Sequence, residues 1–126
     1  MGDCSVILRG VESELSKQSL YSTVHGAGRV MSRTEASGKK KWIRNKENRK
    51  TSLERSGGKI SREMMEDWLR PLGVELRGGG TDESPHCYKR LPDVLKAHNG
   101  TVEVLHRLTP IGVAMAGENE FDPYKD

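Results

Sequence analysis

The chain has 126 residues, of which 33% are hydrophobic, 5% aromatic and 31% charged, with a formal net charge of +3. This length allows one domain at most, and the few apolar residues predict a thin core, as in a partly disordered domain or a segment of a larger protein. No apolar run approaches the roughly 18 residues of a membrane span, and no secretory signal is visible. We therefore expect a cytoplasmic chain with reduced thiols at Cys4 and Cys87.

The first predicted element is a buried strand over residues 4–8, because this run is apolar, contains β-branched residues and is bounded by glycines. Residues 11–20 are mixed and polar, and they carry no clear helical or strand pattern. Residues typical of strands return over 19–24. We expect this second stretch to lead the chain into a segment rich in glycine.

That segment contains one histidine, His25, before Gly26 and Gly28, and two arginines four residues apart, Arg29 and Arg33. Glycines let the backbone approach a ligand closely. If a helix begins near Gly28, its free N–H groups favour an anion beside His25. The two arginines would then share one helix face and bind phosphate oxygens. The pattern predicts a phosphate-handling site, although a glycine-rich turn with a surface histidine explains it equally well.

A short helix over residues 31–37 is expected to end at Gly38. The following insertion, residues 37–59, holds nine Lys or Arg and two acids, so the rest of the chain is net acidic. One interpretation is a nucleic-acid contact, with cations on phosphates and Trp42 stacked on a base. The other, which we favour for the free chain, is a solvated insertion that is disordered in isolation. The two are compatible if RNA orders the insertion.

The clearest helix is predicted over residues 61–70, where Ser61 is a good N-cap and Ile60 and Met65 are spaced as a hydrophobic staple. Its methionines and tryptophan are spaced as a core face rather than a ligand site. Pro71 and Gly73 are expected to end it. A short strand is expected to follow over 74–76.

In the last part of the chain, the residue pattern predicts a second helix over residues 91–98 and a β-hairpin over 101–116 with one buried face. His86 and Cys87 are adjacent, which is not the spacing of zinc ligands, so we interpret them as non-ligands. The residues from 117 onward are acidic and are expected to be irregular.

The segment around His25 resembles the guanylylated-histidine motif of the RtcB family of RNA ligases. Three more segments resemble that family in the same order, from residue 1 to about residue 117. They are Met1-Gly2-Asp3-Cys4-Ser5, which is similar to the end of a Pro-Gly-Ser-Met-Gly segment; Asp82-Glu83-Ser84-Pro85 with Tyr88-Lys89, similar to Asp-Glu-Ala-Pro…Tyr-Lys; and Leu108-Thr109-Pro110-Ile111-Gly112-Val113, similar to the closing strand.

The resemblance implies an α+β chain, a fragment of the RtcB-like mixed α/β fold with short strands and two or three helices. In that organisation, residues 1–36 carry the nucleophile and 37–59 form a basic insertion or linker. Residues 60–117 form a segment of two helices and a β-hairpin, and 118–126 form an acidic tail.

The resemblance also implies a chemistry. The family joins RNA 3′-phosphate or 2′,3′-cyclic phosphate ends to 5′-hydroxyl ends through a GMP–histidine intermediate, with GTP and Mn²⁺. Carried onto this chain, His25 is the nucleophile. The other expected contacts are Met1, Ser5, Gly26, Ala27, Gly28 and Tyr88 for the guanylate, and Arg29 and Arg33 for RNA or GTP phosphates.

Three departures from the family pattern shape the expectation. The family's metal ligands precede the region matched here, so no metal site is expected in this chain and the missing N-terminal part would supply it. Residues 113–117 lack the lysine that reaches the guanine, and the insertion at 37–59 is longer than in simple members. We expect a divergent ligase segment that is inactive alone. The alternatives are a small basic RNA-binding module and a non-functional fragment.

Overall fold

The computed structural model describes residues 1–44 and 49–117, so the predicted acidic tail lies outside the described residues. Helices and strands are mixed along the chain, which confirms the α+β class. In chain order they are β1 (Ser5–Gly10), α1 (Glu14–Gln18), α2 (Arg33–Ser37), β2 (Lys39–Arg44), β3 (Thr51–Ser56), α3 (Arg62–Leu69), β4 (Glu75–Arg77), α4 (Leu91–Ala97), β5 (Val102–Leu108) and β6 (Gly112–Ala114). Short 3-10 turns lie at Arg70–Leu72, Thr81–Glu83 and Pro85–Cys87.

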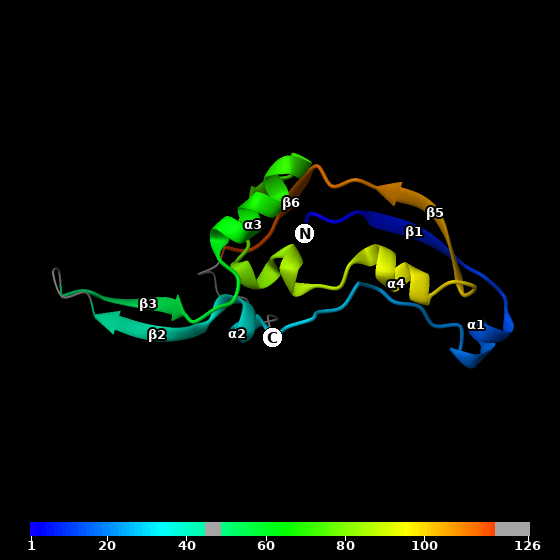
Figure 1. The fold of residues 1–126 in the computed structure, drawn as a ribbon, viewed down its shortest axis with the longest axis horizontal. Coiled ribbons are helices and arrows are strands. Elements are labelled where there is room, and N and C mark those ends of the chain that lie inside the picture. Colours follow the sequence, from blue (N-terminus) through cyan, green and yellow to red (C-terminus); the bar gives the residue numbers. More distant parts are fainter. Residues whose placement is uncertain (45–48, 118–126) are drawn as a thin grey trace.

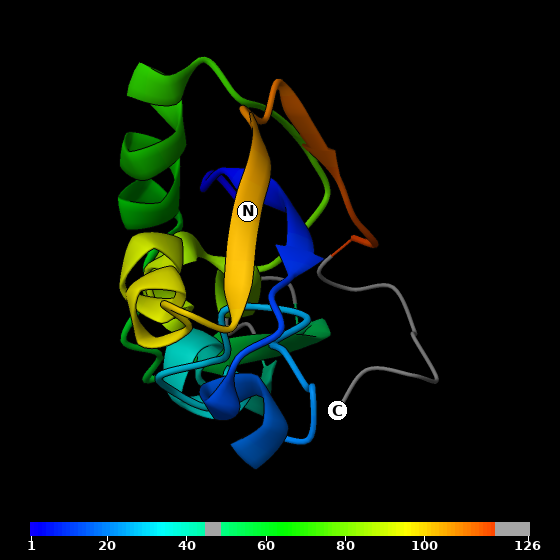
Figure 2. The same cartoon turned by 90° about the vertical axis from the view of Figure 1, so that its right-hand side faces the viewer.

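Within the described residues, the strands form three separate two-stranded sheets. Strand β1 pairs antiparallel with β5, which lies beside it in Figure 2, and the register shifts between Ile7 and Leu8. Strand β2 pairs antiparallel with β3, and β4 pairs parallel with β6. The predicted β-hairpin over 101–116 is therefore wrong. Both of its strands exist, but each pairs with a segment far away in the sequence, and alternation along a strand does not specify its partner.

Within the described residues, the core consists of two small clusters, which agrees with the thin core that the composition predicts. One contains Ala36, Ile60 and Cys87, and the other contains Met65, Leu69 and Val74. The predicted hydrophobic staple is wrong, because Ile60 and Met65 are buried in different clusters.

Helix α3 matches its sequence signals closely. The Ser61 hydroxyl accepts a hydrogen bond from the Met64 N–H at 3.1 Å, which confirms the predicted N-cap. After Leu69, the 3-10 turn Arg70–Leu72 extends the helix to Gly73, which has the left-handed backbone of a C-terminal stop. Met65 and Leu69 are buried, whereas Met64 is exposed, so the apolar face is narrower than predicted.

The segment between α1 and α2 differs from both predictions made for it. Residues 19–24 form no strand, and Leu20 and Tyr21 have positive φ angles of 53° and 55°. The short helix predicted over 31–37 is present as α2 and ends at Gly38 as predicted. It begins at Arg33 rather than near Gly28, because the Ser32 hydroxyl accepts from the Glu35 N–H at 3.0 Å and acts as the N-cap. The two arginines that were expected on one helix face therefore leave different backbone segments.

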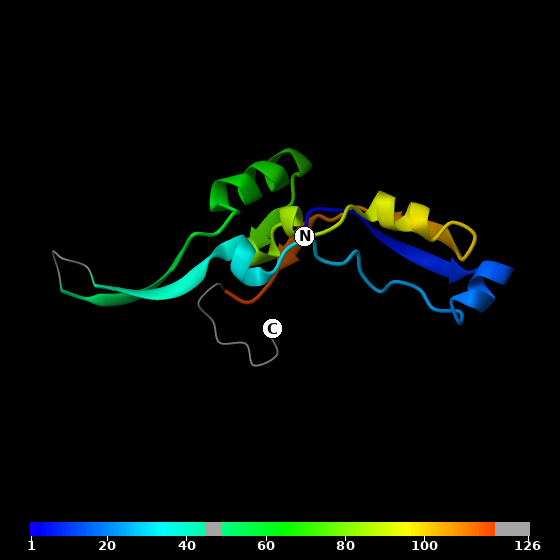
Figure 3. The same ribbon diagram turned by 60° about the horizontal axis from the view of Figure 1, so that its bottom comes forward.

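The described part of the basic insertion forms an antiparallel pair, β2 and β3, where an irregular segment was expected for the free chain. It is solvated as predicted, since every residue of β2 is exposed. Figures 1 and 3 show this pair extending from one end of the elongated molecule, with α1 at the opposite end. None of the described helices is long and apolar enough to cross a membrane.

Candidate functional site

Residues 25–30, which we call the His25 segment, are held in place by backbone hydrogen bonds. The Val30 N–H donates to the Cys87 carbonyl at 2.8 Å, and the Lys89 N–H donates to the Gly28 carbonyl at 3.0 Å. These bonds form an isolated antiparallel bridge between Arg29 and Tyr88. Gly28 has a φ of 82°, a left-handed conformation that glycine adopts at little cost. The His25 segment is thus fixed against residues 87–89, which are about 60 positions away in the chain.

A cavity of about 520 Å³ lies beside this bridge, with walls from the chain start, the His25 segment, residues 85–95 and the region of β6. Six of the seven residues expected to bind the guanylate line it, namely Met1, Ser5, His25, Gly26, Ala27 and Tyr88. Gly28 is not among the lining residues. Its carbonyl instead accepts a hydrogen bond from the backbone N–H of Lys89. The structure therefore brings these six residues together, although the sequence separates Met1 from Tyr88 by 87 positions.

The lining of this cavity combines an apolar wall with the cationic side chain of Lys89. Val6, Leu8, Leu91, Leu95 and Val113 supply the wall. Lys89 lies in the lining with His25 and forms no ion pair with any other described residue. A flat ring can pack against such a wall while an anionic group meets the cation. The cavity is thus suited to a nucleotide-like ligand.

Asp3 ties the chain start to the beginning of α4. One oxygen of its carboxylate accepts from the Cys4 N–H at 2.9 Å, and the other accepts from the Leu91 N–H at 3.4 Å. The Arg90 guanidinium lies 3.5 Å from the same carboxylate and 4.5 Å from the centre of the Trp68 ring. This network fixes two walls of the cavity relative to each other.

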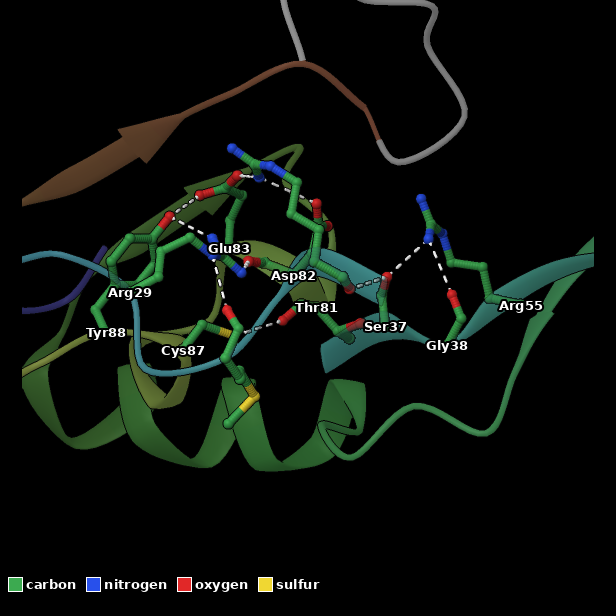
Figure 4. Close-up of polar contacts among 11 residues, drawn as sticks. Arg29, Ser37, Gly38, Arg55, Thr81, Asp82, Glu83, Cys87 and Tyr88 are labelled. Carbon is green, nitrogen blue, oxygen red and sulfur yellow. Dashed lines mark hydrogen bonds and ion pairs between the residues drawn. The ribbon is translucent and has the colours of Figure 1, made fainter. Parts of the chain in front are cut away.

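Next to the cavity, and sharing Tyr88 with it, lies a group that we call the acid–arginine cluster, formed by Arg29, Arg33, Asp82, Glu83 and Tyr88. Figure 4 labels all of these residues except Arg33. The Arg29 guanidinium donates to the Tyr88 hydroxyl at 2.8 Å and to the Asp82 carbonyl at 2.7 Å, and it lies 4.8 Å from the Tyr88 ring centre. The Tyr88 hydroxyl donates to Glu83 at 2.5 Å. Arg33 pairs with Asp82 at 3.2 Å and with Glu83.

The cluster explains what the two arginines do in this structure. The Asp82 side chain is only 1% exposed, and a buried carboxylate requires a cation or hydrogen bonds beside it. Arg33, whose side chain is 28% exposed, supplies that cation. Arg29 joins the His25 segment to the turn at Thr81–Glu83. Both arginines therefore position the segment, and their expected contact with phosphates remains a prediction.

His86 and Cys87 both have structural contacts. Burial raises the pKa of the Cys87 thiol, which the nearby Arg29 guanidinium opposes only in part. The thiol donates to the Thr81 carbonyl at 3.5 Å. The His86 ring packs edge-on against Trp68 at 4.8 Å, and its Nδ1 lies 2.9 Å from the Ser84 hydroxyl.

Manganese, which the family resemblance implies, has no matching ligand set in the part of the chain that the structure describes. No three His, Cys, Asp or Glu side chains are grouped there so as to hold a metal ion. Those residues do not fit such an ion.

Several residues that shape the site have only weak signals in the sequence. Lys89 follows Tyr88 within a segment that resembles the family, and this adjacency could have pointed to it. Asp3 likewise lies within the family-like segment over residues 1–5. The α4 residues Leu91 and Leu95 had no local signal, because their place at the cavity depends on how α4 is docked.

Comparison with known proteins gives one consistent result. The family model of the tRNA-splicing ligase RtcB matches residues 1–116. The chain is 31% identical over 116 residues to the tRNA-splicing ligase RtcB of Pyrococcus horikoshii, covering 90% of this chain and 11% of that protein. It is 30% identical over 118 residues to the RNA-splicing ligase RtcB of Mycobacterium tuberculosis, covering 89% and 22%.

The chain therefore spans between about a tenth and about a fifth of the length of these curated relatives. No solved structure is significantly similar to it. The family match covers nearly the whole chain and includes the glycine segment, the acid–arginine cluster and the cavity lining. The chain belongs to the tRNA-splicing ligase RtcB family.

Proposed function

We propose that this chain is the nucleophile-bearing segment of a GTP- and manganese-dependent RNA ligase that acts in tRNA splicing or RNA repair. The complete ligase would join RNA 3′-phosphate or 2′,3′-cyclic phosphate ends to 5′-hydroxyl ends. The observation that carries the proposal is the cavity, where His25 lies with Met1, Ser5 and Tyr88 from segments far apart in the chain. Membership of the RtcB family supports the same reaction class.

In the proposed reaction, the neutral imidazole of His25 attacks the α-phosphorus of GTP. A phosphorus–nitrogen bond forms, the bond to the leaving pyrophosphate breaks, and the imidazole releases its proton to water. The guanylate then passes to an RNA 3′-phosphate, and a 5′-hydroxyl displaces GMP to close the strand. His25 is exposed at the cavity, and no atom lies within 4 Å of where a Cβ on Gly26 would stand, so both are accessible to a ligand.

The remaining roles follow from the lining. The apolar wall and Tyr88 would hold the guanine, and Lys89 would attract the phosphates of GTP. Lys89 is also a candidate for part of the charge that the family's C-terminal lysine supplies, because residues 113–117 contain no lysine. The metal ligands would come from a part of the ligase outside this chain. We therefore expect the isolated chain to be inactive.

Labelling with α-phosphate-labelled GTP and MnCl₂ tests the proposal. A full-length ligase that contains this segment should form an acid-labile GMP adduct on His25, and His25→Ala should abolish it. The matched control is His106→Ala, because His106 is an exposed histidine on β5 that does not line the cavity. A full-length His25→Ala variant that still carries the adduct would remove His25 from its role.

The isolated chain provides the second arm of the same test. We expect no adduct under the same conditions, because the described residues hold no metal-ligand cluster. A GMP adduct on the isolated chain would contradict the idea that the nucleophile and the metal site lie on different parts of the ligase.

A further inference from the structure

The β2–β3 pair, which we call the basic arm, has no role in the cavity or in the acid–arginine cluster. Figure 3 shows it as a two-stranded extension that leaves the molecule directly after α2. Its strands hold five of the chain's cations, Lys39, Lys40, Lys41, Arg44 and Arg55, and one acid, Glu54. A surface of this charge attracts a polyanion.

The register divides the arm into two faces, because successive residues of a strand point to opposite sides. One face carries Lys40, Trp42 and Arg44, opposite Arg55 and Thr51, and we call it the tryptophan face. The other face carries Lys39, Lys41 and Ile43, and their partners on β3 are Glu54, Ser52 and Ser56. The only acid of the two strands thus lies on the face without the tryptophan.

The tryptophan face is open for binding. Trp42 is 72% exposed, and among the described residues no ring or guanidinium packs on it. Lys40 and Arg44 are exposed and form no ion pair within the described part of the chain. Proteins that bind single-stranded nucleic acid combine these two features, cations that follow the phosphates and an aromatic ring on which a base stacks.

The base of the arm is fixed to the rest of the molecule. The Arg55 guanidinium donates to the Ser37 hydroxyl at 2.7 Å and to the Gly38 carbonyl at 3.2 Å (Figure 4). The Ile60 N–H donates to the Ala36 carbonyl at 2.9 Å, and both of these residues are buried. Because α2 begins with Arg33 of the acid–arginine cluster, the arm has a defined direction relative to the His25 segment.

We propose that the tryptophan face of the basic arm binds single-stranded RNA, with Lys40 and Arg44 on phosphates and Trp42 stacked on a base. The choice of RNA as the strand rests on the proposed function, whereas the binding itself requires neither the cavity nor His25. An acidic protein or an anionic membrane would use the cations but would not need the exposed ring. The test separates these partners.

The experiment measures the fluorescence anisotropy of a labelled 12-nucleotide oligouridylate with a 3′-hydroxyl, titrated with the whole chain at several salt concentrations. The double variant Lys40→Ala/Arg44→Ala should lower affinity by roughly tenfold or more and reduce the salt slope by about 1.4, since each single-strand phosphate contact contributes about 0.7. The matched control, Lys39→Ala/Lys41→Ala, removes the same charge from the other face. It should have a clearly smaller effect on both quantities.

The ring is tested separately. Trp42→Ala should lower affinity by roughly 5- to 100-fold with an unchanged salt slope, and Trp42→Phe should recover part of the loss. A base-free phosphodiester strand should bind the wild type more weakly than oligouridylate does, and its binding should be indifferent to Trp42→Ala.

Several outcomes would overturn the proposal. Equal losses of RNA affinity for the two double variants would show that binding depends only on the overall charge of the arm. Equal affinity for polyglutamate would indicate an acidic protein partner, and equal affinity for phosphatidylserine vesicles would indicate a membrane. The assay contains no GTP and no 3′-phosphate, so it measures RNA binding without guanylylation. Failure of guanylylation in the full-length ligase would therefore not contradict RNA binding by the basic arm. Failure of RNA binding by the arm would likewise not contradict guanylylation of His25.

Discussion

Tyr88 belongs to two neighbouring structures at once. Its side chain lines the cavity, while its hydroxyl accepts from Arg29 and donates to Glu83. Hydrogen bonds to charged groups are stronger than those between neutral groups, particularly where water is partly excluded. This residue therefore connects the expected ligand pocket to the ion pairs that hold the His25 segment.

Tyr88→Phe should lower the free energy of unfolding by about 1–2 kcal/mol, because Arg29 and Glu83 each lose a half-buried partner while the ring is kept. Urea denaturation of the isolated chain measures the change. Tyr21→Phe is the matched control, since Tyr21 is 60% exposed and no hydrogen bond of its hydroxyl is seen in the described structure. Equal stability of the Tyr88→Phe variant and the wild type would show that the hydroxyl contributes no net stability.

At the scale of residues, the sequence predicted the site in part. His25 and its glycines form a local pattern, and their resemblance to a family motif covers neighbouring positions. The partners of Arg29 and Arg33 lie about 50 residues further along the chain, at Asp82 and Glu83. Spacing on a supposed helix could not reveal them. It suggested a free phosphate-binding pair, whereas in the structure Arg33 pairs with two carboxylates and Arg29 is hydrogen-bonded to a hydroxyl and a carbonyl.

Among the elements, the junction of α2 with the basic arm depends on close backbone packing. A Cβ on Gly58 would stand 2.5 Å from the Ser37 carbonyl carbon and 2.6 Å from the Ala36 oxygen. Real Cβ atoms do not approach backbone this closely, so only glycine fits between the end of β3 and α2. The direction of the arm is therefore set by a residue that carries no side chain.

Gly58→Ala should destabilise the chain by about 1–3 kcal/mol, because the added methyl group forces the arm away from α2. Thermal unfolding measures the loss. Gly10→Ala is the control, since its added Cβ has nothing within 4 Å, and the change should stay within about 0.5 kcal/mol. Similar melting temperatures for the Gly58→Ala variant and the wild type would show that the junction can relax.

Elements with local signals were predicted and those without them were missed. Helix α3 has the Ser61 cap and α4 has a proline in its first turn, and both helices lie close to where the sequence places them. Helix α1 has only a short polar sequence. The Ser13 hydroxyl caps it and donates to the Gly100 carbonyl at 2.7 Å, a contact across 87 positions that periodicity does not encode.

For the whole molecule, the sequence predicted the α+β class but not which strands pair with each other. The predicted strands over 4–8, 101–108 and 111–116 all exist in shorter or shifted form. Their partners follow from the path of the backbone. Pro110 lies between β5 and β6, after which the Glu75 N–H donates to the Ile111 carbonyl at 3.1 Å and β6 runs parallel to β4.

The three two-stranded sheets have a consequence for the chain in solution. No third strand joins any of them within residues 1–44 and 49–117, so each sheet presents rows of backbone donors and acceptors along its outer edges. Such edges template the addition of strands from other molecules. Exposed apolar side chains such as Leu105 and Ile111 lie on or near these strands and would be covered by the same association.

The isolated chain should therefore self-associate reversibly as its concentration rises, and sedimentation velocity across a hundredfold dilution series would follow this. Leu105→Lys, which places a charge on β5, should shift the distribution towards the monomer, whereas Leu20→Lys, at an exposed position outside any strand, should not. A chain that stays monomeric throughout the series would show that hydration alone satisfies these edges. If the chains associate through these edges, the open strand edges rather than the thin core limit the concentration at which this segment can be kept in solution.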